Sequence, residues 1–199
     1  MIRDLIEKNR SCRRFDENAA ISEIQLRSWV DLARLSASGA NLQPLKFMLA
    51  NQPERNAAIF ECLAWAGYLK DWKGPERGER PAAYIVILGD TEIGKRFDTD
   101  LGIAAQSILL GAVEAGYGGC MIASIQQDKL RGALEIPERY NILLVIALGK
   151  PVEQVVIEPV KPDGNIQYWR DADGTHHVPK RDLDELIVGS LNRGKELRG

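Results

Sequence analysis

A polar turn at residues 38–44 carries side chains that could bind a flat heterocycle. Its sequence, Ser-Gly-Ala-Asn-Leu-Gln-Pro, places a glycine beside two amide residues and ends in a proline. Gly39 permits a close backbone approach to a ligand, and Pro44 fixes the direction in which the chain leaves. Asn41 and Gln43 each offer a hydrogen-bond donor and an acceptor. An ordinary polar loop has the same composition, so the turn alone leaves both interpretations open.

Two basic clusters near the ends of the chain could bind a phosphate. Arg10, Arg13 and Arg14 lie close together, with the hydroxyl of Ser11 between them. Arginine forks match phosphate oxygens, and a serine hydroxyl adds a compact donor. The second cluster is Lys180–Arg181. Each cluster alone could be a solvated surface group. If both meet in the fold, they would form one phosphate site from opposite ends of the chain.

The glycine-rich segment Gly116–Ser124 could bring backbone N–H groups close to a ligand. It is not a dinucleotide-binding fingerprint, because Met121 stands where the last glycine is required and the segment follows a helix. A helix end at Gly116 and a tight entry into a strand explain these glycines without a ligand. The segment is therefore a weak indication by itself.

Several other chemistries are disfavoured. His176 and His177 are adjacent, so in a strand they point to opposite faces and cannot bind one metal ion together. The turn at residues 171–174 lacks the remaining ligands of a calcium loop and predicts a hairpin. Cys12 stands beside arginines that could lower its thiol pKa, but without a catalytic partner it is better interpreted as a packed residue.

The bulk properties predict one domain over residues 1–199 with a sizeable core. The chain has 199 residues, of which 45% are hydrophobic, and a net charge of −2 gives no support for nucleic-acid binding. No apolar run reaches the length of a membrane span, and the amino terminus lacks the apolar core of a signal peptide. The three cysteines are widely spaced and imply no disulfide framework. We expect a soluble cytoplasmic protein that binds neither nucleic acid nor membranes.

Hydrophobic periodicity predicts helices and strands in mixed order. Ser22 and Gln25 form a capping-box signature at the start of one helix. Helices are expected at about 2–9, 22–36, 53–68, 99–115 and 127–134, and strands at 46–50, 83–88, 117–124 and 142–148. Residues 70–80 are expected to form a loop, and Trp65, Tyr68 and Trp72 an aromatic wall or part of the core. Without regular βαβ repeats, this order indicates an α+β layered sandwich.

Taken in order, these segments resemble the FMN-dependent nitroreductase family. The resemblance spans about residues 2–187 and rests on Asn9–Phe15, Ser36–Pro44, Asp100–Gln106, Gly116–Ser124 and Val178–Arg181. It implies a three-layer sandwich with a mostly antiparallel central sheet. It also implies a homodimer, with a carboxy-terminal segment at about 178–199 that embraces the partner subunit.

The resemblance implies FMN sites at the subunit interface. Arg10, Ser11 and Arg13 would hold the phosphate, the ribityl chain and the pyrimidine edge, and Lys180 with Arg181 would complete the phosphate site. Other residues are implied to approach the same FMN: Ala37, Ser38 and Asn41 from the partner subunit, and the backbone of Ile122, Ala123 and Ser124 near the flavin N5 and O4 edge.

Some positions depart from the family pattern. The family usually has arginine at Asn9, proline at Ala37 and an aromatic residue at Leu45, and residues 121–124 replace a common Trp-Ile-Gly-Gly. Because such positions build the pocket over the flavin, we expect the departures to affect the substrate range rather than FMN binding.

The resulting hypothesis is a flavin oxidoreductase with a ping-pong cycle. NADH or NADPH would pass a hydride to the flavin and leave, and a nitroaromatic, quinone or similar small electron-poor acceptor would then be reduced. Arg13 would stabilise the anionic reduced flavin, and no side chain is assigned as a catalytic acid, nucleophile or metal ligand. The alternatives are a non-catalytic FMN-binding carrier or redox sensor, or a flavoenzyme dedicated to a specific metabolite.

Overall fold

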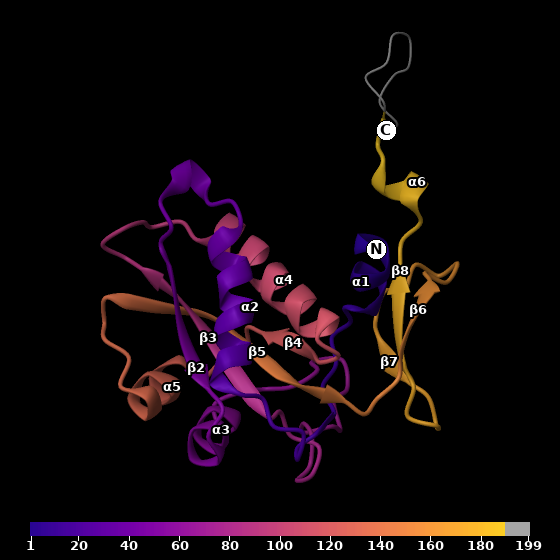
Figure 1. Cartoon of the computed structure of the whole chain (residues 1–199). Helices are drawn as coiled ribbons and strands as arrows, with labels where there is room; N and C mark the ends of the chain where they lie inside the picture. Colours follow the sequence, from indigo (N-terminus) through magenta and orange to yellow (C-terminus); the bar gives the residue numbers. More distant parts are fainter. Residues whose placement is uncertain (190–199) are drawn as a thin grey trace. The chain divides into compact units, whose positions relative to one another are not determined.

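The computed structural model describes residues 1–189, which form two units (Figure 1). The first unit spans Met1–Glu153, and the second begins at Gln154. None of the helices within residues 1–189 is long and apolar enough to cross a membrane.

An antiparallel sheet of five strands forms the centre of the first unit (Figure 1). Residues Val145–Leu148 of the long strand β5 pair with both β3 and β4. The two strands therefore lie on opposite sides of β5. β2 continues the sheet beyond β3, and the short β1 pairs with the last residues of β5. The strands are β1 (Phe15–Asp16), β2 (Leu45–Ala50), β3 (Ala83–Asp90), β4 (Gly118–Ile122) and β5 (Tyr140–Pro151).

Helices cover both faces of this sheet. Alternate residues of β3 divide the core: Val86 packs on the side of α3 and α5, and Ile87 packs on the side of α2 and α4. Burying each such side chain stabilises the fold by about 1.5–3 kcal/mol. The helices of the first unit are α1 (Ile2–Lys8), α2 (Glu23–Leu35), α3 (Pro53–Phe60), α4 (Asp98–Glu114) and α5 (Gln127–Leu134). The expected α+β sandwich with a mostly antiparallel sheet is therefore confirmed.

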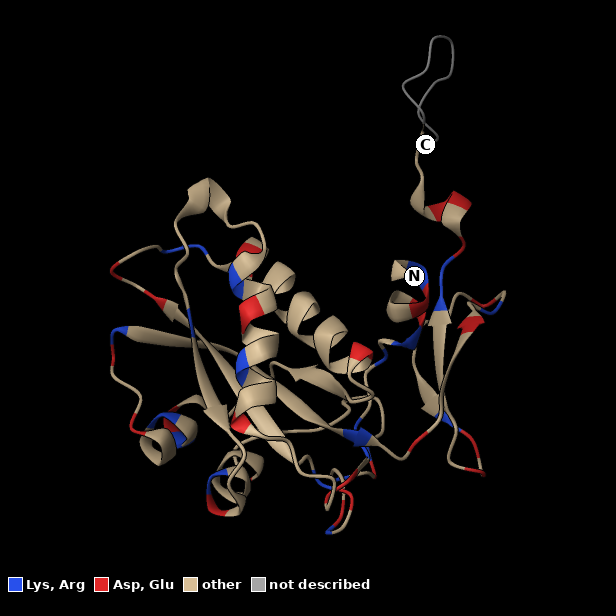
Figure 2. Ribbon diagram, viewed as in Figure 1, with Lys and Arg blue, Asp and Glu red and all other residues tan. Residues whose placement is uncertain are grey.

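α2 illustrates how its sequence specifies an amphipathic helix. The Ser22 side chain accepts a hydrogen bond from the backbone N–H of Gln25, which confirms the expected capping box. Acidic and basic residues follow one another along its outer face (Figure 2), where Arg27 pairs with Glu23 at 2.7 Å. The opposite face buries Leu26 and Trp29 against α4.

The helix expected from residue 53 to about 68 ends at Phe60. Beyond it, the backbone N–H of Gln126 donates to the Cys62 carbonyl at 2.8 Å, and the N–H of Ala64 donates to the Ser124 carbonyl at 3.0 Å. These bonds to another segment replace the helical ones, and Ala66 adopts a left-handed φ of 39°.

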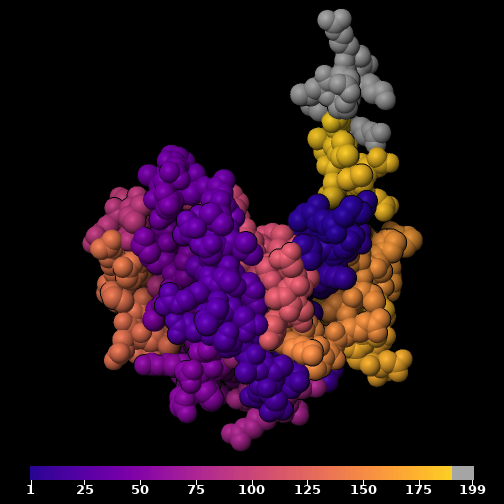
Figure 3. All heavy atoms as spheres, viewed as in Figure 1, coloured from indigo at the N-terminus to yellow at the C-terminus, as the bar shows by residue number. Residues whose placement is uncertain are grey.

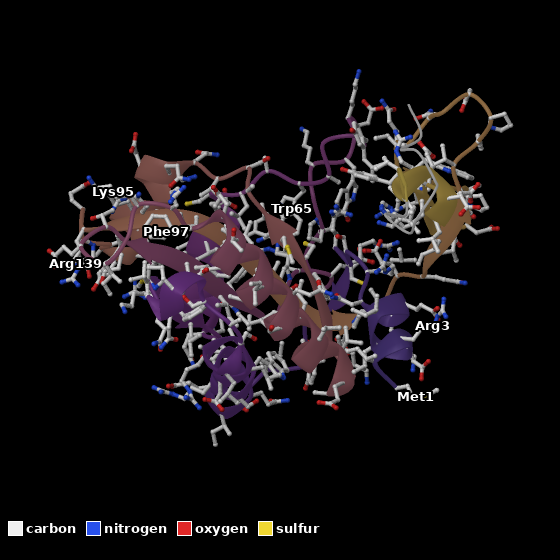
Figure 4. The ribbon with its side chains drawn as sticks, turned by 90° about the horizontal axis from the view of Figure 1, so that it is seen from above. Met1, Arg3, Trp65, Lys95, Phe97 and Arg139 are labelled. Atoms are coloured by element: carbon white, nitrogen blue, oxygen red, sulfur yellow. The ribbon has the colours of Figure 1, made fainter. Side chains whose placement is uncertain are left out.

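Trp65, Tyr68 and Trp72 therefore do not share the face of a helix. Trp65 is 8% exposed and packs in the core, with its ring 5.5 Å from that of Phe60. Tyr68 is 50% exposed, and Trp72 packs against the edge of the same core. Figure 4 shows Trp65 well away from the end of the unit that carries Phe97 and Arg139. Residues 70–80 form the expected loop.

The second unit is built around β8 (His176–Lys180). β7 (Trp169–Arg170) pairs with it antiparallel through the turn at residues 171–174, which confirms the predicted hairpin. β6 (Val155–Pro159), which the sequence did not indicate, pairs with β8 in parallel. A short helix, α6 (Leu183–Leu186), follows. Residues 190–199 of the expected partner-embracing segment lie outside the described part of the chain.

Candidate functional site

The segment Arg10–Arg14 lies against the edge of the central sheet. Ser11 forms a parallel bridge with Gly119 of β4, and the backbone N–H of Cys12 donates to the Gly119 carbonyl at 3.0 Å. A Cβ on Gly119 would overlap the carbonyl oxygen of Ala147, so only glycine fits this position in the sheet. Two motifs that are distant in the sequence are thereby joined.

Arg14 forms an ion pair with Glu79. Its Nε and Nη2 donate to the two carboxylate oxygens of Glu79 at 2.7 Å and 2.5 Å. The hydrogen bond to Glu79 raises the pKa of Arg14. This bidentate pair neutralises the arginine and fixes the loop before β3 beside β1.

Arg10 and Arg13 face different surroundings. Arg10 Nη2 donates to the Ile6 carbonyl at 2.8 Å, while its buried Nε has no hydrogen-bond partner within residues 1–189. Arg13 Nη1 donates to the Ser11 carbonyl at 3.3 Å. Two cations of the predicted cluster therefore lie beside the first residues of β4, next to the exposed Ser11.

Glu153 fixes the backbone of the same segment. One of its carboxylate oxygens accepts from the backbone N–H of both Arg13 and Arg14, the latter at 3.1 Å. Burial, and next the charge of Glu153, raise the pKa of the Cys12 thiol to about 12. The thiol therefore stays protonated near neutral pH, as expected of a packed residue rather than a nucleophile.

The loop between α2 and β2 contains the second group of predicted residues. Ala40, Asn41 and Gln43 have φ values of 48°, 55° and 52°, a left-handed conformation that costs about 1–2 kcal/mol per residue without glycine. The loop projects beyond the end of α2 (Figures 1 and 3), and its Asn41 side chain is exposed. Such backbone persists only where surrounding contacts hold it.

Asp100, in the first turn of α4, supplies those contacts. It accepts from the Ser38 hydroxyl and, at 2.9 Å, from the backbone N–H of Gly39. The Ser38 oxygen in turn accepts from the N–H of Gln43 at 2.9 Å. The one hydroxyl proton of Ser38 is thus donated to Asp100. Beneath the loop is a cavity of about 210 Å³ whose lining includes Ala37, Ser38 and Asp100.

The end of β4 carries the third group. Ile122 is 6% exposed, whereas Ala123 and Ser124 are exposed directly after the strand. Their backbone is fixed by the bond from the Ala64 N–H to the Ser124 carbonyl. In the second unit, Lys180 is exposed at the end of β8, and Arg181 pairs with Glu185 of α6. That these two complete a phosphate site stays a prediction.

A further charged cluster belongs to the scaffold. Arg139 binds the fully buried Asp90 at 2.8 Å and 2.7 Å and Glu92 at 2.8 Å, at the end of β3 (Figure 4). The hydrogen bond from Arg139 lowers the pKa of Asp90. No group of three histidine, cysteine, aspartate or glutamate side chains within residues 1–189 could hold a metal ion.

Sequence reasoning did not identify the carboxylates that position these segments. Asp100 had a usable signal, since it stands in the first turn of an almost wholly apolar helix, where a carboxylate interacts favourably with free N–H groups. Glu79 and Glu153 stand in ordinary charged surroundings, and only the folded structure brings them to Arg13 and Arg14.

Comparison with known proteins gives a consistent picture. A model of the nitroreductase family matches residues 6–150. Over 196 residues the chain is 26% identical to a Bacillus subtilis (strain 168) protein called "Putative NAD(P)H nitroreductase YodC", covering 83% of this chain and 97% of that protein.

Solved structures agree on the fold. An FMN-dependent nitroreductase from Clostridium difficile R20291 is similar with a TM-score of 0.64 and 25% identity, covering 77% of this chain and 89% of its own. A nitroreductase family protein from Streptococcus pneumoniae TIGR4 gives a TM-score of 0.66 at 18% identity, covering 82% and 96%.

Proposed function

Because the chain belongs to the nitroreductase family, we propose that it is an NAD(P)H-dependent oxidoreductase that uses FMN. The observation that carries this proposal is the pairing of the segment Arg10–Arg13 with β4, which places the exposed Ser11 between two arginines at the edge of the sheet. The names of the related proteins, an NAD(P)H nitroreductase and an FMN-dependent nitroreductase, support the choice of donor and cofactor. We further propose nitroaromatics, quinones or similar electron-poor molecules as acceptors.

The residues along β4 fit the parts of FMN. Arg10 has a buried Nε without a partner in the described chain, and with Arg13 it offers charge-assisted bonds to the phosphate or the pyrimidine edge. Ser11 is exposed between them and can donate its hydroxyl proton. From Gly119, beside Ser11, to Ser124 an extended chain covers roughly 16 Å, which suits an elongated molecule. The exposed backbone at 122–124 would approach the flavin edge.

A second copy of the chain would complete the site in this proposal. Ala37, Ser38 and Asn41 would come from the partner, and Lys180 with Arg181 would add positive charge at the phosphate. Ser38 would act mainly by positioning its loop, because its proton is already donated to Asp100. Light scattering tests the homodimer: a monomer that binds FMN tightly would contradict the assignment of the loop to the partner.

The protein's contribution is binding, charge and shielding from water. When bound, FMN supplies the hydride chemistry between the nicotinamide and the acceptor. Arg13 would place a permanent positive charge near the pyrimidine edge, where negative charge develops on reduction. Neither Cys12, whose thiol stays protonated, nor another side chain is needed as a nucleophile or general acid.

The first experiment is a visible spectrum of the purified protein without oxygen, followed by NADH and NADPH in turn. Bleaching of the flavin band that a quinone or nitroaromatic reverses supports the oxidoreductase and identifies its donor. A flavin that neither donor bleaches favours the carrier or sensor alternative. No flavin after reconstitution would contradict the proposal.

Replacing both Arg10 and Arg13 with alanine tests the assigned residues. Each loses a charge-assisted contact of about 1.5–3 kcal/mol, so the FMN dissociation constant should rise roughly 10²–10⁴-fold. Fluorescence titration with FMN measures it. Arg27→Ala, on the exposed face of α2, is the matched control and should leave FMN affinity unchanged. Equal affinity of the double variant and the control would disprove the assignment.

A further inference from the structure

A second cavity, of about 220 Å³, lies in the first unit between α3 and the segment that enters β3. Arg80, Asn56 and Glu17 are among the polar residues that line it, and Phe60 and Pro81 contribute apolar surface. It includes none of the residues assigned to FMN. A ligand of this cavity would therefore be additional to the proposed function and independent of it.

Arg80 is a half-buried cation without a carboxylate partner in the described chain. No ion pair or hydrogen bond to it is found within residues 1–189, and its Nε is buried without a partner. Its guanidinium carbon lies 4.0 Å from the centre of the Phe60 ring. Stacking uses the face of the guanidinium, so the in-plane N–H groups stay available for an anion. The neighbouring Glu79 binds Arg14 through both its oxygens.

Asn56 and Glu17 restrict what the anion can be. Asn56 Nδ2 donates to the Ala82 carbonyl at 2.8 Å, while its buried Oδ1 has no partner within residues 1–189. This oxygen favours a ligand that also carries a hydroxyl or amino donor. Glu17, fixed by the backbone N–H of Gly78, adds negative charge to the lining. A second negative charge on the ligand would be repelled.

We propose that this cavity binds a small organic monocarboxylate, with its carboxylate on Arg80 and its apolar body against Phe60 and Pro81. An unpaired cation in partly buried surroundings is costly, and a carboxylate offsets that cost with bidentate bonds. The cavity is smaller than the roughly 300–1,000 Å³ of sites for drug-sized ligands, so only a small molecule fits. Uncharged analogues and dicarboxylates should bind more weakly.

Calorimetric titration of the full-length, FMN-loaded protein tests the proposal. Butyrate and benzoate should bind at millimolar concentrations or below, at least ~10-fold more tightly than butyramide and benzamide, which lack the charge. Succinate and phthalate should bind more weakly than the monocarboxylates. No heat from either monocarboxylate would mean that the cavity holds only water, and equal binding of the amides would remove the role of Arg80; both results overturn the proposal.

Variants show whether binding occurs in this cavity. Arg80→Met keeps the stem on Phe60 but removes the charge, and it should weaken monocarboxylate binding at least ~10-fold. Arg77→Met, an exposed neighbour that does not line the cavity, is the matched control and should not change it. If Arg80→Met does not fold, Arg80→Lys keeps the charge without the fork and should still bind more weakly than the parent. Unchanged affinity in a folded Arg80 variant would place the ligand elsewhere and overturn the proposal.

Discussion

Two of the segments that carry predicted cofactor residues in the first unit are held by carboxylates from distant parts of the chain. Glu153 binds two backbone N–H groups of Arg10–Arg14, and Asp100 binds Ser38 and Gly39. The first segment is also paired with β4 and continues into β1. The loop at 36–44 has no strand pairing and contains three left-handed residues other than glycine.

The difference separates a part of the candidate site that is paired with the sheet from a loop that Asp100 ties to α4. Buried Cys12 and Phe15 hold the arginine segment against the sheet even without Glu153. In the loop, the bonds of Asp100 to Ser38 and Gly39 tie the strained backbone to α4. We infer that substitutions near the loop change the site more readily than substitutions near the arginines.

Of the three changes that test this comparison, Asp100→Ala should have the largest effect. It removes the partners of the Ser38 hydroxyl and the Gly39 N–H, which should lower the free energy of unfolding by about 1–3 kcal/mol and raise the FMN dissociation constant ~10–100-fold. Urea unfolding and FMN titration measure both. Asp98→Ala is the matched control, since Asp98 is exposed in the same first turn of α4 and has the same interaction with the helix dipole. Similar FMN binding in the two variants would contradict the dependence of the loop on Asp100.

Glu153→Ala should have a smaller effect on FMN binding. Two backbone N–H groups lose their acceptor, so the free energy of unfolding should fall by about 1–3 kcal/mol. Pairing with β4 and β1 should keep the arginines in place, and the FMN dissociation constant should rise less than ~5-fold, under 1 kcal/mol. Glu153→Gln retains a carbonyl acceptor and should recover part of the stability. The comparison is wrong if Glu153→Ala weakens FMN binding more than Asp100→Ala does.

The sequence predicted those parts of the fold that rest on local pattern. The apolar runs of β3 and β5 and the Ser22 cap specify their own elements, and the glycines of 116–119 indicated a helix end and a tight entry into a strand. The end of α3 could not be predicted, because pairing of Cys62–Ala64 with residues 124–126 overrides local propensity. The ties of Glu153 and Glu79 to the arginine segment span more than sixty residues and leave no trace in local sequence.

A further segment with predicted cofactor residues, β8 in the second unit, is also held by carboxylates, but through a histidine that titrates. His177 Nδ1 lies 3.1 Å from Glu158 and Nε2 lies 3.2 Å from Asp171, while the ring stacks on Trp169 at 4.0 Å. A neutral imidazole has one N–H and can donate to only one carboxylate, whereas the imidazolium donates to both. The hydrogen bond to Asp171, and then that to Glu158, therefore raises the pKa of His177.

The raised pKa of His177 sets the sign of the pH dependence of stability. Of the effects predicted for Asp100, Glu153 and His177, this one should be the smallest. Because the folded pKa lies above the unfolded value of about 6.5, the stabilisation is complete below that pH and is lost as pH rises through the folded pKa. NMR titration of the imidazole should give a His177 midpoint above about 6.5. His177→Gln should remove the corresponding loss of stability at higher pH and leave the FMN contacts of the first unit unchanged. A midpoint at or below the unfolded value would mean that the imidazole does not hold both carboxylates, and β8 would then depend on strand pairing alone, like the arginine segment without Glu153.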